Sequence, residues 1–401
     1  MMRWMTDARS GAAGPGVPPR RGGVASREQL LGWALAAVGI SGAMVAVALS
    51  PGAARSAAAQ DWSPFVLVAS LLMIGLVADR DGLFATAGHH LARSLRTGPI
   101  LFIGATAMIG LVTALLNLDT SVAFLTPVFI YTARSRGDGE APLLFGCLLL
   151  SNAGSLFLPG SNLTNLIVLG HLHLTGSQFF ARMWLPALVA LGVTAAVIGF
   201  FERDSLRASA NPVVDPDPPV LGLGLVAIVF ATVFVVVLPS PALPVGAVAV
   251  VAVAIRLVQR RQSAAQIVAV LGVPVLVGLF GLAVALGTLG RGWSAPATHL
   301  SHLDAWATAG VAALASVLFN NLPAASLLGA RTPNHSFALL IGLNLGPNAF
   351  ITGSLAWVLW LRAATTAGAK PSIRRATRIG LVAVPFSMVA AIAALSLTGS
   401  S

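Results

Sequence analysis

Cysteine is almost absent from this chain, because Cys147 is the only one. A single thiol excludes an internal disulfide and any metal site built from several thiolates. Lysine is equally scarce, since Lys370 stands alone and the net charge of +11 comes almost entirely from arginine. The sequence also lacks an HExxH motif, a nucleophile elbow and a Walker A loop, so we expect no enzyme and no metal centre.

Charged residues make up only 9% of the 401 residues, whereas about 25% is usual for soluble domains. Hydrophobic residues make up 56%, and the mean hydropathy is +0.86. Several apolar runs approach or exceed the roughly 20 residues that cross a bilayer core. The short segments of alternating polarity typical of a transmembrane barrel are missing. Composition therefore predicts an all-α polytopic membrane protein.

Polar segments divide the chain into four predicted regions. Residues 1–28 form a basic tail rich in Gly, Pro and Arg, which we expect to be disordered. Residues 29–201 form a first membrane half, residues 202–219 a polar cytoplasmic linker and residues 220–401 a second half. The first apolar span, Leu30–Leu49, also resembles a cleaved signal peptide, but it is longer than the usual signal core. We therefore favour a first membrane helix.

Arginine placement predicts the orientation in the membrane. Along the expected path, only Arg55, Arg182, Arg291 and Arg331 of the 24 Lys and Arg residues fall outside. This bias follows the positive-inside rule and explains the basic charge without a nucleic-acid partner. We expect about 9 to 11 segments across a plasma (inner) membrane, with the N-terminus cytoplasmic and the C-terminus outside.

Two apolar stretches are interrupted by polar residues, glycine and proline. They are Ser151–Gly170 (SNAGSLFLPGSNLTNLIVLG) and Leu343–Leu361 (LNLGPNAFITGSLAWVLWL). A helix broken at membrane depth must satisfy its backbone groups from protein or water. Such broken helices are a common way for transporters to build a substrate site.

The two halves share an internal repeat. The features that recur in the same order are Asn117 and Asn320–Asn321 after apolar spans, Asn152 and Asn344, and Gly160-Ser161 and Gly353-Ser354. Chance similarity of apolar segments is the alternative, and the preserved order argues against it. In the predicted topology the first hairpin opens inside and the second outside. This inverted repeat places a site near the midplane, between the halves.

The interruptions supply hydroxyls, carboxamides and unwound backbone, which can replace the hydration shell of a polar solute or a cation. The predicted substrate-binding residues are Asn117, Ser161, Asn162, Thr164, Asn165, Asn320, Asn321, Asn344, Thr352, Gly353 and Ser354. The alternative for these positions is helix capping at a structural kink. The clustering of several such residues favours a site, because one cap needs only one of them.

Asp119 is the one carboxylate that the predicted path places deep in an apolar region. Ionisable residues there are costly and indicate function by default. Asp119 is therefore a candidate proton-coupling residue. The alternative, in which it caps a hairpin together with Thr120 and Ser121, is equally open. We expect no cofactor, and a proton or alternatively a sodium ion as the coupling ion.

Four sequence motifs resemble one family of carriers. They are NNLPAASLLGA (Asn320–Ala330), IGLNLGPNAFITGSLAWVLWLR (Ile341–Arg362), LTP (Leu125–Pro127) and SNLTN (Ser161–Asn165). Together they resemble the bacterial arsenite/antimonite permeases of ArsB type. These belong to the ion transporter superfamily, with the sodium/dicarboxylate symporters and the NhaD-type sodium/proton antiporters. Two departures are Leu118, which separates Asn117 from Asp119, and Ile351-Thr352 in place of the family's Pro-Ile.

The resemblance implies an inverted-repeat transporter with a scaffold, a moving transport domain, two re-entrant hairpins and two broken helices. The implied function is proton-coupled arsenite or antimonite efflux. Alternatives are a carrier for an organic or inorganic anion such as a dicarboxylate or citrate, a sodium/proton antiporter, a passive channel for neutral hydroxides and an inert sensor. The expected partners are a small-molecule or ion substrate and the lipid bilayer. The resemblance also allows a homodimer and an ATPase subunit, for neither of which the sequence shows a docking surface.

Overall fold

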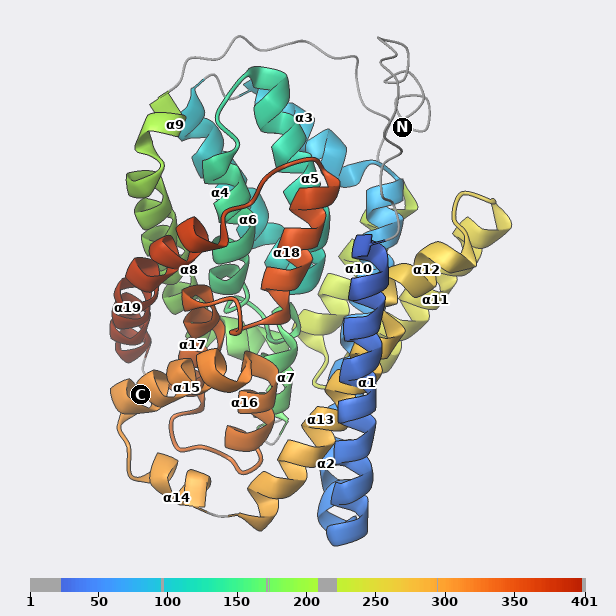
Figure 1. The fold of residues 1–401 in the computed structure, drawn as a ribbon, viewed down its shortest axis with the longest axis vertical. Coiled ribbons are helices and arrows are strands. Elements are labelled where there is room, and N and C mark those ends of the chain that lie inside the picture. The colour runs from blue at the N-terminus through green and yellow to red at the C-terminus, as the bar shows by residue number, and fades with distance from the viewer. Residues whose placement is uncertain are drawn as a thin grey trace.

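The computed structural model describes residues 23–94, 97–170, 172, 174–207, 222–293 and 295–398, and its regular elements are all helices (Figure 1). In this described part, six helices are long and apolar enough to cross a membrane. Four further apolar helices are shorter, at 10 to 17 residues. The all-α polytopic class predicted from composition is confirmed.

The first half contains long helices and short connecting ones. Its elements are α1 (Gly23–Leu49), α2 (Pro51–Arg80), α3 (Leu83–Ser94), α4 (Gly98–Leu115), α5 (Leu118–Arg136), α6 (Ala141–Gly154), the 3-10 turn η2 (Pro159–Ser161), α7 (Leu163–Leu169), α8 (Gly176–Phe201) and α9 (Arg203–Arg207). Helix α1 begins at Gly23, which corrects the expected tail boundary at residue 28, because the helix extends past the apolar run. The predicted disorder of residues 1–22 concerns residues outside the described part of the structure. The same holds for most of the predicted linker, residues 202–219, of which only the start is described, where α9 lies.

The elements of the second half include, like those of the first, a hairpin, then a broken helix and then a long helix. They are α10 (Leu223–Val237), α11 (Ala242–Val258), α12 (Ala264–Leu271), α13 (Val273–Gly292), α14 (Ala295–Ser301), α15 (Ala305–Phe319), α16 (Asn321–Leu328), α17 (Ser336–Leu345), the 3-10 turn η3 (Gly346–Ala349), α18 (Leu355–Thr366) and α19 (Ile373–Leu397). The long apolar stretch of residues 264–292 is divided between α12 and α13. Gly272 separates them with a φ of 55°, a conformation that glycine adopts at little cost.

The interruptions seen in the sequence form two hairpins and two broken helices. The hairpins are α4–α5, which turns at Asn117, and α15–α16, which turns at Asn320. The broken helices are α6–η2–α7 and α17–η3–α18. In Figure 1, α6 lies above α7, whereas α17 lies below α18, so the two broken helices run in opposite directions. The predicted inverted repeat is therefore present in the fold.

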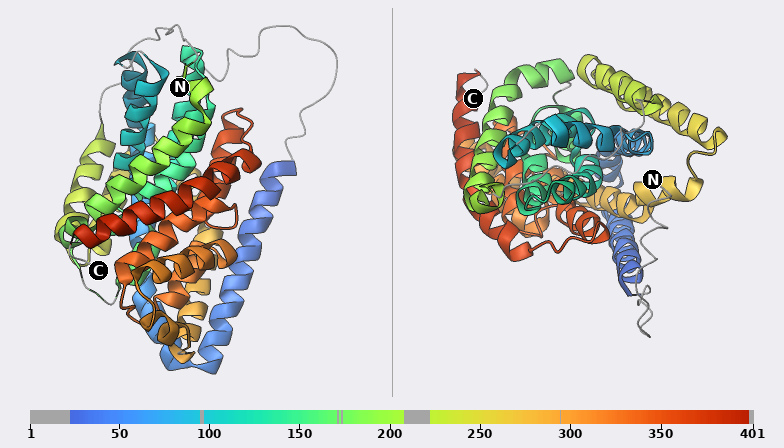
Figure 2. Two further views of the ribbon diagram at one scale, coloured as in Figure 1. Left: turned by 90° about the vertical axis from the view of Figure 1, so that its left-hand side faces the viewer. Right: turned by 90° about the horizontal axis from the view of Figure 1, so that it is seen from above.

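Small residues allow the helices at one side of the molecule to approach closely. Helix α1 packs along α13, where a Cβ on Gly39 would lie 2.0 Å from the carbonyl oxygen of Gly278. Such contacts are typical of helix pairs in membranes, where packing and not hydrophobicity drives association. On the other side, α8 and α19 pack against each other, as Figure 2 also shows.

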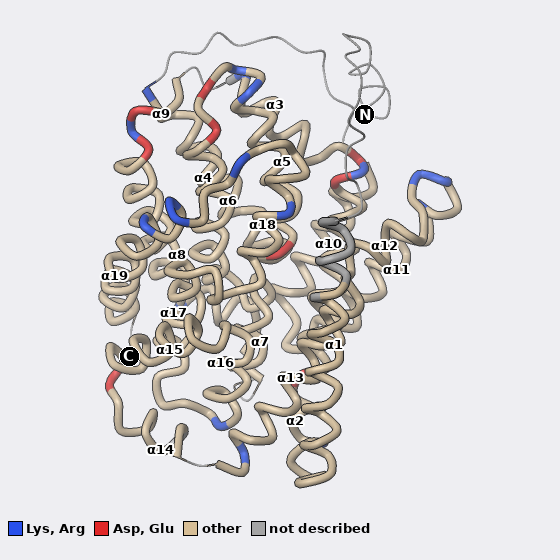
Figure 3. The backbone as a smooth tube through the Cα atoms, in the orientation of Figure 1, with Lys and Arg blue, Asp and Glu red and all other residues tan. Residues whose placement is uncertain are grey.

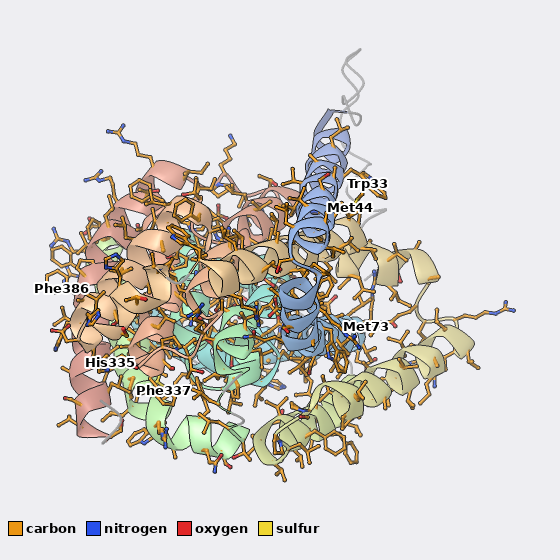
Figure 4. The ribbon with its side chains drawn as sticks, turned by 90° about the horizontal axis from the view of Figure 1, so that it is seen from below. Trp33, Met44, Met73, His335, Phe337 and Phe386 are labelled. Carbon is orange, nitrogen blue, oxygen red and sulfur yellow. The ribbon has the colours of Figure 1, made fainter. Side chains whose placement is uncertain are left out.

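Large apolar side chains cover much of the exterior. Trp33, Met44 and Phe386 are 65%, 67% and 63% exposed, and they lie at the periphery of the view in Figure 4. Charged residues gather at one end of the long axis, near α3 and α9, while few lie beside α14 at the other (Figure 3). An apolar surface with basic residues toward one end is the pattern expected of a multi-pass membrane protein.

Candidate functional site

A cavity of about 250 Å³ lies where the two halves meet. The first turns of α5, α7, α16 and α18 reach it, and Leu35 of α1 with Leu279 and Leu282 of α13 forms part of its wall. Its polar lining consists of Asp119, Asn162, Thr164, Asn320, Asn321 and Ser354. The structure therefore brings together, from both hairpins and both broken helices, six residues that the sequence predicted for the site.

The lining of the cavity contains one ionisable residue and no basic one among the described residues. Among the described residues that line it, Asp119 is the only ionisable one, and the other polar groups are amides and hydroxyls. The lining can therefore both donate hydrogen bonds to a solute and accept them from it, and it carries no fixed positive charge.

Three asparagines cap the helices that begin here. Asn117 Oδ1 accepts from the Thr120 amide at 2.7 Å, and Asn162 Oδ1 accepts from the Thr164 amide at 3.3 Å. Asn320 Oδ1 accepts from the Leu322 amide at 3.3 Å. The capping alternative thus describes these three side chains, two of which also line the cavity. Asn117, and not Asp119, supplies the cap of the first hairpin.

Asn320 has a backbone φ of 77° and a ψ of 148°. This positive-φ conformation lies outside the αL region that asparagine tolerates and close to a region populated almost only by glycine, and such strained positions cluster at functional sites. Its Nδ2 donates to the carbonyl oxygen of Thr352 at 3.2 Å, which ties the hairpin tip to the second helix break.

Two hydroxyls on the cavity have no protein partner. Thr164 and Ser354 are 1% and 2% exposed, and neither Thr164 Oγ1 nor Ser354 Oγ makes a hydrogen bond within the described part of the chain. Buried polar atoms in native proteins almost always have a partner. These two hydroxyls are therefore available to a solute or a water in the cavity.

Behind the cavity, Asn344 joins the two helix breaks. Its Oδ1 accepts from Ser155 Oγ and from Asn162 Nδ2, both at 2.6 Å. Its Nδ2 donates to Asn165 Oδ1 at 2.7 Å and to the Leu340 carbonyl at 2.8 Å. A carboxamide can make about four such bonds, so the side chain of Asn344 has little capacity left for a solute.

A second pair of amides extends this network. Asn152 Nδ2 donates to Asn348 Oδ1 at 2.8 Å, and Asn348 Nδ2 donates to the Leu149 carbonyl at 3.0 Å. The sequence repeat had matched Asn152 with Asn344. Nothing in the sequence around either residue indicated that each would form hydrogen bonds with residues of the opposite half. The network fixes the two breaks relative to each other.

The remaining predicted residues hold the hairpins against the breaks. Ser161 Oγ donates to the Ala114 carbonyl at 3.2 Å in the first half, and Thr352 Oγ1 donates to the Val317 carbonyl at 2.7 Å in the second. The Gly353 carbonyl accepts from the Asn321 amide at 2.8 Å. The residues of the predicted set that do not line the cavity are Asn117, Ser161, Asn165, Asn344, Thr352 and Gly353. Direct contact of any of the eleven with a substrate stays a prediction, as does proton coupling by Asp119.

Comparison with known proteins places the chain among transporters. The model of the citrate transporter family (CitMHS) matches residues 24–351. The arsenical pump membrane protein of Escherichia coli is 26% identical over 338 residues, which cover 75% of this chain and 78% of that protein. The protein of the same name from Yersinia enterocolitica is 26% identical over 340 residues, with the same coverage.

A solved structure of the Alcanivorax borkumensis YdaH transporter aligns with 92% of this chain and 97% of its own, at 13% identity and a TM-score of 0.47. The resemblance to arsenite permeases that the motifs had indicated is confirmed by the sequence relatives. With the family model matching residues 24–351, the chain belongs to the citrate transporter family of membrane transporters.

Proposed function

We propose that this protein is a secondary transporter that exports arsenite and antimonite, using a proton gradient. The observation that carries the proposal is the cavity lining, which consists of amides, hydroxyls and one carboxyl group. At neutral pH arsenite is an uncharged trihydroxide, with a donor and an acceptor on each oxygen. A lining without basic residues suits such a solute, and the curated relatives are named as arsenical pump membrane proteins.

The unpartnered hydroxyls provide the first contacts for this solute. Thr164 and Ser354 come from the two broken helices, one from each half of the repeat. Their hydroxyls can therefore form hydrogen bonds with the trihydroxide from two sides of the cavity. Asn321, from the second hairpin, adds a carboxamide on the same cavity. Polar groups that converge on an otherwise apolar cavity are what orients a small ligand.

Asp119 couples transport to protons in this proposal. It lies in the first turn of α5, it faces the cavity, and Asn117 has already taken the role of helix cap. Ionisable groups at membrane depth are characteristic of proton relays. A protonated Asp119 donates a hydrogen bond to the solute, and an ionised Asp119 accepts one, so its protonation state and solute binding are linked.

A small carboxylate is the second candidate substrate. Helices α5, α16 and α18 all begin at the cavity, and helix N-termini favour anions. The match to the citrate transporter family favours the same class. Asp119 and the lack of a basic residue in the lining argue against it, unless a sodium ion supplies positive charge.

Flux into everted membrane vesicles distinguishes these candidates. Vesicles are assayed with arsenite, citrate or succinate, each with and without an imposed proton or sodium gradient. We expect arsenite to accumulate only when the lumen is acidic. Accumulation against a gradient excludes a passive channel, and citrate flux without arsenite flux would overturn the proposal.

The Asp119→Asn variant tests the coupling step. We expect it to lose proton-driven accumulation of arsenite while downhill exchange of arsenite across the membrane persists. The matched control is Asp204→Asn, because Asp204 is an exposed carboxylate on α9, with a side chain 91% exposed. Full proton-driven accumulation by Asp119→Asn would remove Asp119 from the coupling mechanism.

A further inference from the structure

A second buried ionisable group lies outside the cavity, on α2. Asp61 is 2% exposed, and its Oδ1 has no hydrogen-bond partner in the described part of the structure. Its carboxylate interacts electrostatically with the guanidinium of Arg291, on α13. A Cβ on Gly287 would lie 3.1 Å from Arg291 Nη1 and 3.9 Å from Asp61 Oδ2, so the guanidinium and the carboxylate both lie beside Gly287. Buried charges are stabilised by such pairing, and inside a membrane they indicate function.

Arg291 and the neighbouring Gln60 connect this charge to α7. Arg291 Nη2 donates to Gln60 Oε1, and Gln60 Nε2 donates to the Ile167 carbonyl at 2.9 Å. Arg291 Nη1 also donates to the Gly287 carbonyl at 2.9 Å, which orients the guanidinium. We name Gln60, Asp61 and Arg291 the α7 clamp.

The clamp holds the end of α7 that points away from the cavity. Ile167 follows the cavity residue Thr164 by three positions, which is about 5 Å along a helix axis. The Gly170 amide also donates to the Ile167 carbonyl, at 3.3 Å, so the Gln60 amide adds a second hydrogen bond, from another helix, to the last turn of α7. A displacement of this helix end by one hydrogen-bond length therefore also moves Thr164.

The same part of α13 contacts the second half of the site. A Cβ on Gly290 would lie 2.7 Å from the Leu327 carbonyl of α16, so the two backbones are in close contact. Arg331, which follows α16, donates from Nη2 to the Arg291 carbonyl at 2.8 Å. Arg291 thus links α2 and α13 to α7 through its side chain, and to the segment after α16 through its backbone.

We infer that the α7 clamp is a latch which fastens the cavity-bearing helices α7 and α16 to α2 and α13, and which opens when the cavity is exposed at the α14 end of the molecule. This inference rests on the proposed transport function, because alternating access requires contacts between the bundles to break on one side at a time. Polar contacts between membrane helices have modest strength, so a few of them hold one conformation without making it permanent.

The latch is tested by the accessibility of the cavity. A cysteine is introduced at Phe319, which lines the cavity, after Cys147→Ser has removed the native thiol. The rate of labelling by a membrane-impermeant maleimide is then measured from each side, in whole cells and in everted vesicles. Gln60→Glu keeps an acceptor for Arg291 but removes the donor to Ile167, and Gln60→Met removes both.

We expect both Gln60 variants to increase labelling from the α14 side about threefold to twentyfold and to leave labelling from the opposite side unchanged or lower. The matched control is Ser56→Ala, an exposed position of α2 whose hydroxyl bonds only within the helix. Arg291→Lys, which keeps the charge beside Asp61 but loses the planar donor pair, is expected to behave like Gln60→Met.

Unchanged labelling in these variants, or an equal increase from both sides, would overturn the inference that the α7 clamp is a latch. The clamp would then be only a packing contact between the helices. The labelling assay needs no substrate, so its result is independent of whether arsenite is the solute. A one-sided shift in labelling together with absent arsenite flux would therefore reject the proposed substrate while the latch stands.

Discussion

At the scale of single residues, hydrogen-bond capacity separates the groups that can bind a solute from those that position them. Asn344 uses both lone pairs of its carbonyl oxygen and both amide hydrogens within the protein. Thr164 and Ser354 leave their hydroxyls unpartnered on the cavity. Substitutions at these two kinds of position should therefore fail in different ways.

Replacing Asn344 should damage the protein itself. Asn344→Asp keeps the shape but removes both donors and sets a carboxylate against the Asn165 carbonyl oxygen, at a cost of about 1–3 kcal/mol for each buried group left unsatisfied. We expect a lower melting temperature in detergent and loss of transport. Asn334→Asp, at an exposed position, is the control. A variant of wild-type stability with only a raised KM would show that Asn344 contacts the solute.

Removing the free hydroxyls should affect the solute alone. Thr164→Val and Ser354→Ala each delete one hydrogen bond to the solute, worth about 0.5–1.5 kcal/mol, so we expect KM for arsenite to rise about twofold to tenfold. Because the deleted groups have no protein partner, the melting temperature should not fall. The control is Thr365→Val on the exposed face of α18, which makes the same replacement of threonine by valine at an exposed position. A fall in stability with unchanged KM would contradict this assignment.

At the scale of elements, close backbone contacts hold the second helix break. Helix α19 crosses η3, and a Cβ on Gly380 would lie 1.8 Å from the carbonyl oxygen of Asn348. Asn348 belongs to the amide network behind the cavity. The indole of Trp357 supports the same break, since its Nε1 donates to the Pro347 carbonyl at 2.8 Å. The position of the break is therefore determined by neighbouring helices as well as by its own sequence.

Gly380→Ala tests the dependence of the break on α19. The added methyl group has no space, so we expect α19 or η3 to shift, with a loss of stability of about 1–3 kcal/mol and a marked loss of transport. Gly310→Ala in α15 is the matched control, because nothing lies within 4 Å of the new Cβ there. That change should stabilise the helix by up to about 1 kcal/mol. Equal behaviour of the two variants in a thermal-unfolding assay would contradict the packing argument.

At the scale of the whole molecule, the fold consists of two groups of helices with the cavity between them. Leucines of α1 and α13 form the wall on one side, and the hairpins and broken helices supply the polar groups on the other. The α7 clamp joins the same two groups toward the α14 end. A movement of one group against the other would change access to the cavity without dismantling its lining.

The orientation of the molecule in the membrane is tested by labelling at its two ends. In the Cys147→Ser background, we expect Ser301→Cys, in α14, to react with an impermeant maleimide in intact cells. Ala264→Cys, beside the arginines of the α11–α12 connection, should react only in everted vesicles, since basic segments stay cytoplasmic. The reverse pattern of labelling would invert the proposed topology.

Much of the fold and part of the site could be predicted from sequence. The hairpin turns at Asn117 and Asn320 and the breaks near Gly160 and Gly353 were visible, because each is a run of polar or helix-breaking residues inside apolar sequence. The wall residues Leu35, Leu279 and Leu282 had no such signal, since a leucine facing a cavity has the same local sequence context as one facing lipid. Asp61 was missed because it precedes the apolar core of its helix.

Composition and local interruptions of the apolar runs are enough to predict the membrane class, the places where helices break and the inverted repeat. Which polar groups face the cavity, and which bond to other groups of the protein, depends on how the helices pack. Asn162 and Asn344 are 182 positions apart, and their hydrogen bond exists only because two broken helices cross. Such a contact depends on the packing of the whole chain, which no local pattern encodes.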